Sequence, residues 1–237
     1  EQPRRGNAGK PLQSAKVEVV ADEQTWFGIF RFGQWPNYYE GVQFPKDDNS
    51  LTEFFNGMIP DIGPYDPALN VNAMDALFNK IGNGILVTHS QSGGLGWQTL
   101  LKNDKIKGLV AFEPGGDFIF PEGDATSSFN LFGFKVPLQT VPMSEFKKFT
   151  KMPIIIYYGD NIPTEPSTNA GKEQWRTFLD VARKWRDVVN KNGGNVTLIH
   201  LPEVGIKGNT HFPFADLNNV RVADHLSKWL KEKGLNK

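Results

Sequence analysis

Four short runs of apolar residues recur along the chain, and each ends in glycine, proline or small polar residues. They cover 85–87, 107–112, 152–160 and 196–201. Continuous apolar runs of this length are typical of strands that are buried on both faces, as in a parallel sheet. Because a helix-like segment at 95–102 joins the first run to the second, the pattern predicts a parallel βαβ unit.

Helical spacing of apolar residues predicts most of the remaining elements. Helices are expected at 71–80, 172–192 and 219–233, and a glycine follows each of them closely. A capping box, Ser-Leu-Thr-Glu at 50–53, predicts a further helix that starts at Ser50 and runs toward Gly57 or Ile59. Strands and helices together predict an α/β fold with a mostly parallel sheet and flanking helices.

Two segments interrupt this alternation. Aromatic residues crowd into 26–44 among glycine and proline, so this segment does not fit one long amphipathic helix. It could line an apolar pocket or pack a cap onto the core. Residues 117–150 are rich in phenylalanine and lack a helical or strand period. An insertion of this length between parallel strands is typical of a lid or a pocket wall.

Composition narrows the possible functions. The chain has 237 residues, which fits a single domain over 1–237, with 26 Lys and Arg, 26 Asp and Glu, and no cysteine. Balanced charge argues against nucleic-acid binding, and the lack of cysteine excludes disulfides and thiolate chemistry. No apolar run is long enough to cross a membrane. Since Asp47, Asp48 and Asp216 have no converging ligand spacing, no metal and no other cofactor is expected.

The stretch 83–94 carries the strongest chemical signal. An apolar strand ends abruptly in His-Ser, and small residues lead into a helix. This is the pattern of a nucleophile elbow, in which a tight turn places a serine at the end of a strand. Ser90 is the predicted nucleophile, because the strand 85–87 delivers it to the position where an elbow serine normally lies. The flanking residues Thr88 and Ser92 are small enough for the turn, although neither is the usual glycine. Ser92 is the alternative nucleophile, with Ser90 and Gly94 as its own neighbours, and an ordinary loop serine is the structural alternative.

Two further reactive groups are expected at the same edge of the sheet, because ligands bind beyond the carboxyl ends of parallel strands. Glu113 follows the second predicted strand, and His211 lies in the loop after the fourth. His211 would take the proton of Ser90, and a carboxylate on its other nitrogen would hold the imidazole in place. The backbone N–H of Gln91 would donate to the oxyanion.

The other histidines have ordinary structural explanations. His89 adjoins Ser90, where a structural hydrogen bond is expected. His200 lies within a strand pattern and is interpreted as a core or edge residue. His225 is expected at the surface of the last helix or packed beneath the sheet.

In combination, the motifs of this chain resemble those of the α/β-hydrolase superfamily. They are His-Ser-Gln-Ser-Gly-Gly at 89–94, Phe-Glu-Pro-Gly at 112–115, Tyr-Gly-Asp at 158–160, Gly-Asn-Thr-His at 208–211 and the stretch 216–224. Within the superfamily the chain is similar to a small group of bacterial carboxylesterases, whose Ser–Glu–His triad has its Glu after the sixth strand. The resemblance covers most of the chain, implies esterase activity and maps the triad onto Ser90, Glu113 and His211.

Two acids compete for the carboxylate position. Asp160 follows the third predicted strand, where most α/β-hydrolases keep their acid, but the usual place is three residues after the glycine, and Ile162 occupies it. Glu113 ends its own strand, and its longer side chain can span the extra distance. Glu113 is therefore the predicted acid, while Asp160 is the second choice or a residue that caps a helix or braces a loop.

The same resemblance places residues 2–10 in the loop that follows the family's fourth strand. Strands one to four, with the loop that gives the second oxyanion N–H, would then lie upstream of this sequence. The chain is therefore expected to be the C-terminal part of a longer domain, because four strands make a small sheet with an exposed edge. The alternative is a minimal hydrolase with a divergent or flexible N-terminus. A periplasmic or secreted location would follow from an upstream signal.

The predicted function is that of a serine hydrolase, which cleaves carboxylic esters through an acyl-enzyme and favours an apolar or aromatic group in the substrate. The alternative is a hydrolase-fold protein with weak catalysis that acts in binding or interaction. The expected partner is a small-molecule ester. A second copy of the chain in a homodimer and a missing N-terminal segment or chain are the further candidates.

Overall fold

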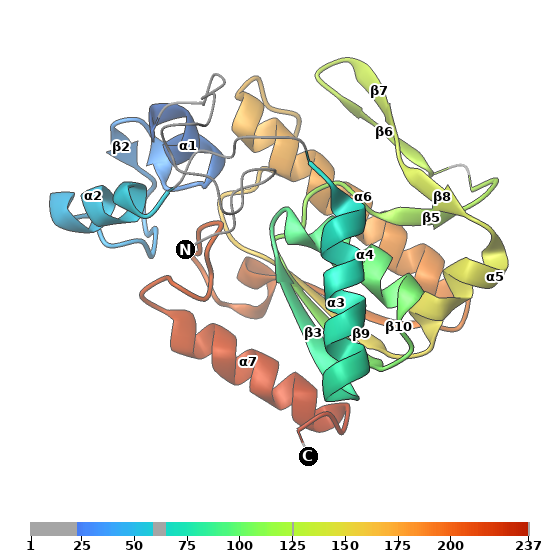
Figure 1. Ribbon diagram of the computed structural model, residues 1–237. Helices are drawn as coiled ribbons and strands as arrows, with labels where there is room; N and C mark the ends of the chain where they lie inside the picture. Colours follow the sequence, from blue (N-terminus) through green and yellow to red (C-terminus); the bar gives the residue numbers. More distant parts are fainter. Residues whose placement is uncertain (1–22, 59–64, 125, 237) are drawn as a thin grey trace, which may run out of the picture.

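A parallel sheet forms the centre of the molecule. The computed structural model describes residues 23–58, 65–124 and 126–236. Four strands pair in parallel in the order β10-β9-β4-β3 (Figure 1). They are β3 (Gly84–His89), β4 (Ile106–Phe112), β9 (Pro153–Tyr158) and β10 (Asn195–His200). All four lie within two residues of their predicted boundaries.

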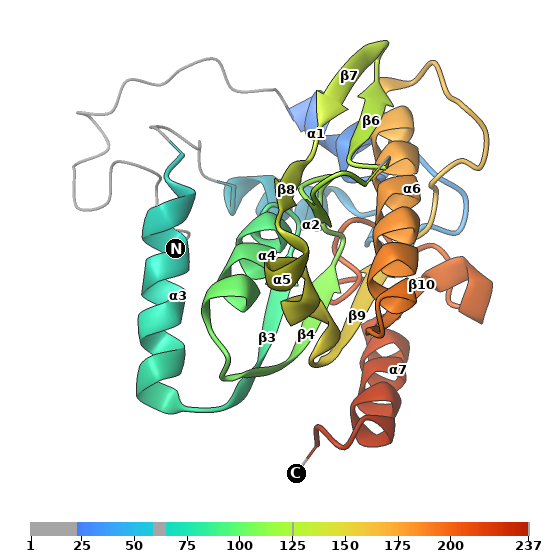
Figure 2. The same cartoon turned by 90° about the vertical axis from the view of Figure 1, so that its right-hand side faces the viewer.

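Helices cover both faces of this sheet (Figures 1 and 2). Residues of α4 (Ser92–Lys102) and α6 (Ala170–Lys191) share one core with Leu109 and Ala111, and α3 (Pro67–Ile81) packs beside α4. Residues of α7 (Asn219–Glu232) share the opposite core with Val110 and Phe112. Since alternate residues of β4 are buried on opposite sides of the sheet, its sequence is continuously apolar over residues 109–112. This arrangement confirms the predicted α/β-hydrolase-like fold.

Three helices begin earlier than predicted, whereas α6 and α7 match their predicted ranges within two residues. In α2 (Asp48–Asn56) the N-cap is Asp47, whose carboxylate accepts hydrogen bonds from the backbone and the hydroxyl of Ser50. The prediction that Ser50 starts this helix is therefore wrong, because Ser50 occupies the third helical position. The helices α3 and α4 begin four and three residues before their predicted starts.

The aromatic segment 26–44 folds into short elements around a small second core. These elements are α1 (Glu23–Ile29) and the antiparallel strands β1 (Gly33–Gln34) and β2 (Asn37–Tyr38), and α2 follows them. The buried side chains are Phe27, Phe32, Val42, Phe44 and Phe55. Phe212, from the loop after β10, packs against them. The aromatic segment therefore contacts the loop that carries His211.

The insertion 117–150 contains short elements that its sequence does not indicate. They are β5 (Ile119–Pro121), β6 (Ser128–Leu131), β7 (Phe134–Pro137), β8 (Gln139–Val141), α5 (Met143–Phe146) and the 3-10 helix η2 (Lys147–Thr150). A second 3-10 helix, η3 (Leu201–Val204), follows β10. The strands β6 and β7 form an antiparallel hairpin that projects from the body (Figure 1). Its side chains are mostly half-buried or exposed, so no alternating pattern arises.

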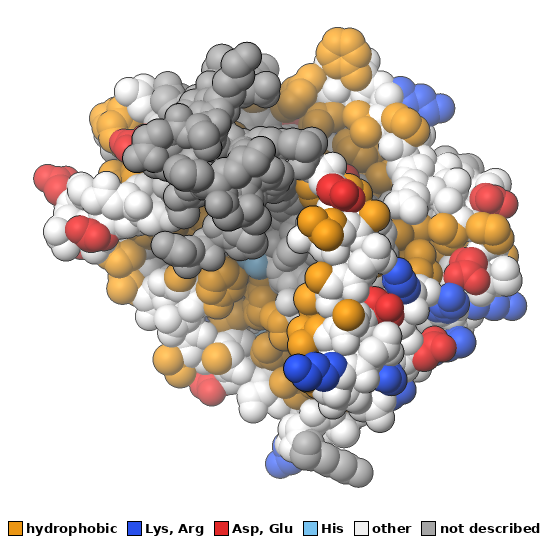
Figure 3. Space-filling model, in the orientation of Figure 1, with side chains coloured by type: hydrophobic (Ala, Val, Ile, Leu, Met, Phe, Trp, Pro, Cys, Tyr) orange, Lys and Arg blue, Asp and Glu red, His pale blue; other side chains and the backbone are white. Residues whose placement is uncertain are grey.

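Strand β3 forms one edge of the sheet, and Val87 within it is 58% exposed. Apolar side chains are visible across this side of the molecule (Figure 3). Residues 2–10, on which the expectation of upstream strands rests, lie outside the described residues. The longer domain therefore stays a prediction. Within the described ranges, no helix is both long and apolar enough to cross a membrane.

Candidate active site

Ser90 lies in a strained turn between β3 and α4. Its φ is 54°, in the left-handed region that residues with a Cβ rarely adopt. The Ser90 N–H donates to the carbonyl oxygen of Phe112 at 3.0 Å, and its own carbonyl accepts from Gly93 at 2.9 Å. The strand, tight turn and helix expected of a nucleophile elbow are thus present at this serine.

The helix that follows Ser90 packs closely on its strand because a glycine lies at the contact. A Cβ at Gly96 would come within 2.7 Å of the Thr88 methyl carbon. Any larger residue would therefore push α4 away from β3 and open the turn. The small residues around Ser90 have the steric role that the sequence suggested.

Ser92, the alternative nucleophile, has a structural set of hydrogen bonds. Its hydroxyl donates to the backbone carbonyl of His89 at 2.7 Å and accepts from the backbone N–H of the same residue at 2.9 Å. The His89 imidazole in turn contacts the carbonyl oxygen of His211 through Nε2, at 2.8 Å. Both side chains therefore brace the turn and its neighbouring loop, which favours Ser90 as the free hydroxyl.

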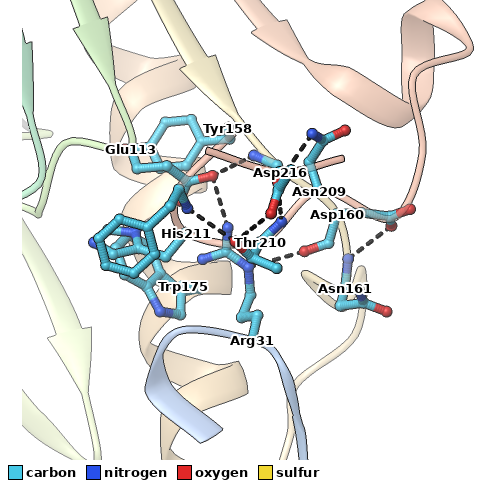
Figure 4. Close-up of polar contacts among 12 residues, drawn as sticks. Arg31, Glu113, Tyr158, Asp160, Asn161, Trp175, Asn209, Thr210, His211 and Asp216 are labelled. Carbon is cyan, nitrogen blue, oxygen red and sulfur yellow. Dashed lines mark hydrogen bonds and ion pairs between the residues drawn. The ribbon is translucent and has the colours of Figure 1, made fainter. Parts of the chain in front are cut away.

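Glu113 and His211 meet at the carboxyl end of the sheet, although 98 positions separate them in the sequence. Both side chains are buried, and Glu113 Oε2 lies 3.3 Å from His211 Nδ1 (Figure 4). The other oxygen, Oε1, accepts hydrogen bonds from Arg31 Nη2 at 2.6 Å and from the backbone N–H of Gly159. The acid preferred from the sequence thus contacts the predicted base.

The surroundings of this pair favour an ionised acid and a neutral base at neutral pH. Burial acts to raise the pKa of Glu113, but the charge of Arg31 and the hydrogen bond to His211 outweigh it and hold the pKa at about 2. Burial lowers the pKa of His211 to about 4, although Glu113 acts in the opposite direction. A neutral imidazole beside a carboxylate can accept a proton and be stabilised once it is charged.

Asp160, the alternative acid, points away from His211. Its carboxylate accepts hydrogen bonds from the backbone N–H groups of Gly208 and Asn161, each at 2.7 Å. This is the loop-bracing arrangement considered for it from the sequence. Ile162, in the position where an acid would be usual, is buried with 8% exposure.

Asp216 fixes the loop that presents His211. Its carboxylate accepts from the Thr210 backbone at 2.8 Å, from the Thr210 hydroxyl at 2.9 Å and from the Asn209 amide at 3.0 Å (Figure 4). On the other side of the loop, the His211 N–H donates to the carbonyl oxygen of Phe30 at 3.0 Å. The sequence did not indicate this role, because a carboxylate five residues after the histidine has no recognised spacing.

Arg31 was also missed from the sequence. It is fully buried, and its guanidinium carbon lies 4.7 Å from the ring centre of Trp175. The position of Arg31 between Phe30 and Phe32 is a signal in the sequence, because a charge that is buried among aromatic residues needs a partner of opposite charge. The sequence does not show which acid that partner is, because 82 positions separate Arg31 from Glu113.

Ser90, Gln91 and His211 line one pocket of about 380 Å³. Apolar side chains from α1 and the residue that follows it, from the β6–β7 hairpin and from α6 form most of its wall. They are Trp26, Ile29, Phe30, Phe129, Leu131, Val136, Trp175 and Phe178. Asp117 and Gln174 add polar groups. The candidate reactive groups therefore share a concave site of the size that small ligands occupy.

The two remaining histidines lie elsewhere. His200 ends the edge strand β10, with Nδ1 3.5 Å from Glu203. His225 on α7 contacts the Tyr157 hydroxyl at 2.9 Å. Among the described residues, no group of three or more His, Asp or Glu is placed to hold a metal ion.

Comparison with known proteins connects this fold to ester hydrolases. No protein-family model matches the chain. A probable secreted lipase, phiG, of a fungal species is 23% identical over 238 residues, which cover 90% of this chain and 65% of the lipase. The solved structure of a bacterial esterase matches with a TM-score of 0.73 and 27% identity, over 94% of this chain and 61% of that one. The chain thus spans less than two thirds of the length of either relative, and the predicted likeness to esterases is confirmed.

Proposed function

We propose that this chain, which has the α/β-hydrolase fold of esterases and lipases, cleaves carboxylic esters through an acyl-enzyme formed on Ser90. One observation carries the proposal. Ser90, in a strained turn, and His211 line the same largely apolar pocket, and the buried carboxylate of Glu113 contacts His211, although the three residues come from separate parts of the sequence. Nucleophile, base and acid have to converge in this way for acyl transfer.

In the proposed reaction, His211 Nε2 takes the hydroxyl proton of Ser90 while Oγ attacks the carbonyl carbon of the ester. The tetrahedral oxyanion accepts a hydrogen bond from the backbone N–H of Gln91, at the start of α4. When the intermediate collapses, the alcohol leaves with the proton from His211. Water then attacks the acyl-serine with His211 again as base, and this step releases the carboxylic acid and restores Ser90.

Glu113 would act through His211 rather than on the substrate. It stays ionised at neutral pH, because its pKa of about 2 is far below the working range. Its negative charge stabilises the imidazolium that forms in the transition state. The distance of 3.3 Å between Glu113 Oε2 and His211 Nδ1 is long for a charged hydrogen bond, and we expect it to shorten when the imidazole becomes charged.

The pocket wall indicates which esters fit. Aromatic rings such as Phe30, directly after α1, and Trp175 in α6 favour an acyl or alcohol group that is apolar or aromatic. Asp117 adds a carboxylate at the same pocket, so anionic substrates are disfavoured. We therefore expect uncharged esters of moderate size to be the better substrates.

A hydrolase-fold binding protein with weak catalysis is the competing function. The observation that favours it is that, within the described part of the chain, no hydrogen bond joins the Ser90 hydroxyl to the His211 imidazole. Loose contacts between nucleophile and base are common in unliganded hydrolases, so this geometry is also compatible with catalysis.

Covalent labelling distinguishes the two functions. A fluorophosphonate probe is expected to add one adduct per chain, located on Ser90 by peptide mass spectrometry. Ser90→Ala should lose both the adduct and the hydrolysis of p-nitrophenyl butyrate. Ser92→Ala, the matched control two residues away, should keep the adduct. An adduct on Ser92, or hydrolysis that survives in Ser90→Ala, would refute the proposal.

A further inference from the structure

Arg31 joins three elements around the candidate acid. Its Nη2 donates to Glu113 after β4 at 2.6 Å, and its Nε donates to the backbone oxygen of Asp160 after β9 at 2.8 Å. Its guanidinium lies over the ring of Trp175 in α6 (Figure 4). Arg31 and Glu113 are both 0% exposed. The orientation of the guanidinium is therefore fixed from three sides.

These contacts determine which oxygen of Glu113 faces the base. Oε1 is taken by Arg31 and by the N–H of Gly159, so Oε2 is the oxygen that remains for His211. Without Arg31 the carboxylate would have a single N–H holding its far oxygen and could rotate about its terminal torsion. The separation between acid and base would then no longer be fixed.

The stability of the fold does not by itself explain why Arg31 and Glu113 form a buried ion pair. A buried ion pair contributes little net stability, because removing two charges from water costs about as much as their attraction returns. Arg31 Nη1 also has no hydrogen-bond partner among the described residues, and an unsatisfied buried donor is destabilising. A role in the active site accounts for an arrangement that is costly to the fold.

We propose that Arg31 is a positioning residue, which holds one oxygen of Glu113 toward His211 and keeps His211 unprotonated in mildly acidic solution. The inference rests on the proposed esterase function. Arg31 touches neither Ser90 nor a reacting atom, so it acts entirely through Glu113 and His211.

The electrostatic part of the role follows from charge. Burial is the main cause of the lowered pKa of His211, and the positive charge of Arg31 adds a smaller effect in the same direction. For Glu113, burial acts to raise the pKa, and the charge of Arg31 is the main cause that lowers it. The other ionisable side chains that face or adjoin the pair are His89, Asp117, Tyr158, Asp160 and Asp216. None of these groups is substituted when Arg31 alone is replaced, so a difference between variants reports on the loss of the Arg31 charge and its contacts.

The first test replaces Arg31 with methionine, which keeps much of the volume without the charge. The acid–base pair should then bind a proton at higher pH, whichever member carries it. The acid limb of kcat/KM for p-nitrophenyl butyrate should rise by at least half a pH unit. A misplaced acid should also lower kcat by about 10- to 100-fold. Arg31→Gln keeps an N–H donor without the charge, and it takes the place of Arg31→Met if that variant does not fold.

Arg183→Met is the matched control. Arg183 pairs with Glu203 at 2.9 Å and with Asp180 at 3.7 Å on the surface, and it does not line the pocket. This variant makes the same chemical change and should leave both kcat and the acid limb unchanged. Circular dichroism and thermal melting of each variant establish that folded proteins are compared.

A double-mutant cycle tests whether Arg31 acts through Glu113. In the Glu113→Gln background there is no charged acid to position, so adding Arg31→Met should change kcat by less than about threefold. An effect as large as in the wild-type background would mean that Arg31 acts through Trp175 or Asp160 and would overturn the inference. An acid limb and a kcat that Arg31→Met leaves unchanged would overturn it as well.

Failure of the inference can be told apart from failure of the proposed function. If Ser90→Ala still hydrolyses the ester in the same assay, the esterase proposal fails whatever Arg31 does. If Ser90→Ala is inactive while Arg31→Met behaves like the wild type, only the role of Arg31 is refuted.

Discussion

A single methyl group at Gly159 is expected to impair catalysis without removing any reacting group. Gly159 follows β9, and its N–H donates to Glu113 Oε1. A Cβ at this position would lie 2.6 Å from the carbonyl oxygen of Thr210, 2.7 Å from that of Asn209 and 2.9 Å from Glu113 Oε1. Two of these three atoms belong to the backbone of the loop that carries His211. The loop has to move if alanine replaces Gly159.

The distance that the loop carrying His211 has to move determines how far kcat is expected to fall. Ordinary contact begins at 3.4 Å, so the Thr210 carbonyl must retreat by about 0.8 Å. His211 is the next residue and would move by a similar distance from Glu113. Since a misplacement of about 1 Å can cost about 100-fold in rate, we expect Gly159→Ala to lower kcat by about 10- to 100-fold. Overpacking should also reduce the free energy of unfolding by about 1–3 kcal/mol.

Steady-state kinetics on p-nitrophenyl butyrate, together with urea denaturation, measure both effects. KM should change less than kcat, because the apolar side chains that form most of the pocket wall are not substituted. Gly28→Ala in α1 is the control, since a Cβ there meets no atom within 4 Å. A kcat for Gly159→Ala within twofold of the wild type, in a protein shown to be folded, would refute the steric argument.

Three further predictions concern the acids and the base. Glu113→Gln should lower kcat by about 1,000-fold or more, and Asp160→Asn by less than about tenfold; the reverse order in kinetics would reassign the acid. Because the pKa of His211 is about 4, kcat/KM should hold down to about pH 5, and an acid limb near 6.5 would contradict this. Burial raises the pKa of Asp216 to about 6, although its hydrogen bonds act in the opposite direction. The folded state therefore binds this proton more tightly than the unfolded state, so the contribution of Asp216 to the free energy of unfolding is fully present below about pH 4 and is lost as the pH rises through 6. In Asp216→Asn, this decrease in the free energy of unfolding, which is about 3 kcal/mol at most, should be absent when urea denaturation is compared between pH 4 and 6.

The sheet could be predicted from the sequence because burial on two faces leaves a strong local signal. In β4, Leu109 and Ala111 face one core while Val110 and Phe112 face the other, so these four consecutive positions are all apolar. The elbow at Ser90 is similarly local, since strand, turn and helix are consecutive. Helix starts were less certain, because Asp47 and Ser50 can both cap a helix and only the fold decides between them.

The surroundings of the acid could not be predicted, because the contacts join distant parts of the sequence. Arg31, Glu113 and Gly159 meet only after β4 and β9 have paired. The strands of the insertion were missed for a different reason. Residues such as Phe129 and Val136 pair within a hairpin that is only partly covered, so neither face acquires a clear apolar pattern.

If this chain is the esterase we propose, the hydrogen bond between the His211 N–H and the Phe30 carbonyl would couple substrate recognition to turnover. Phe30 belongs to the pocket wall, and its ring stacks on the imidazole with centroids 5.5 Å apart. A bulky acyl group that displaces the Phe30 ring would therefore also move His211, the proposed general base. Poorly fitting esters should then lower kcat as well as raise KM, because they are bound but hydrolysed slowly.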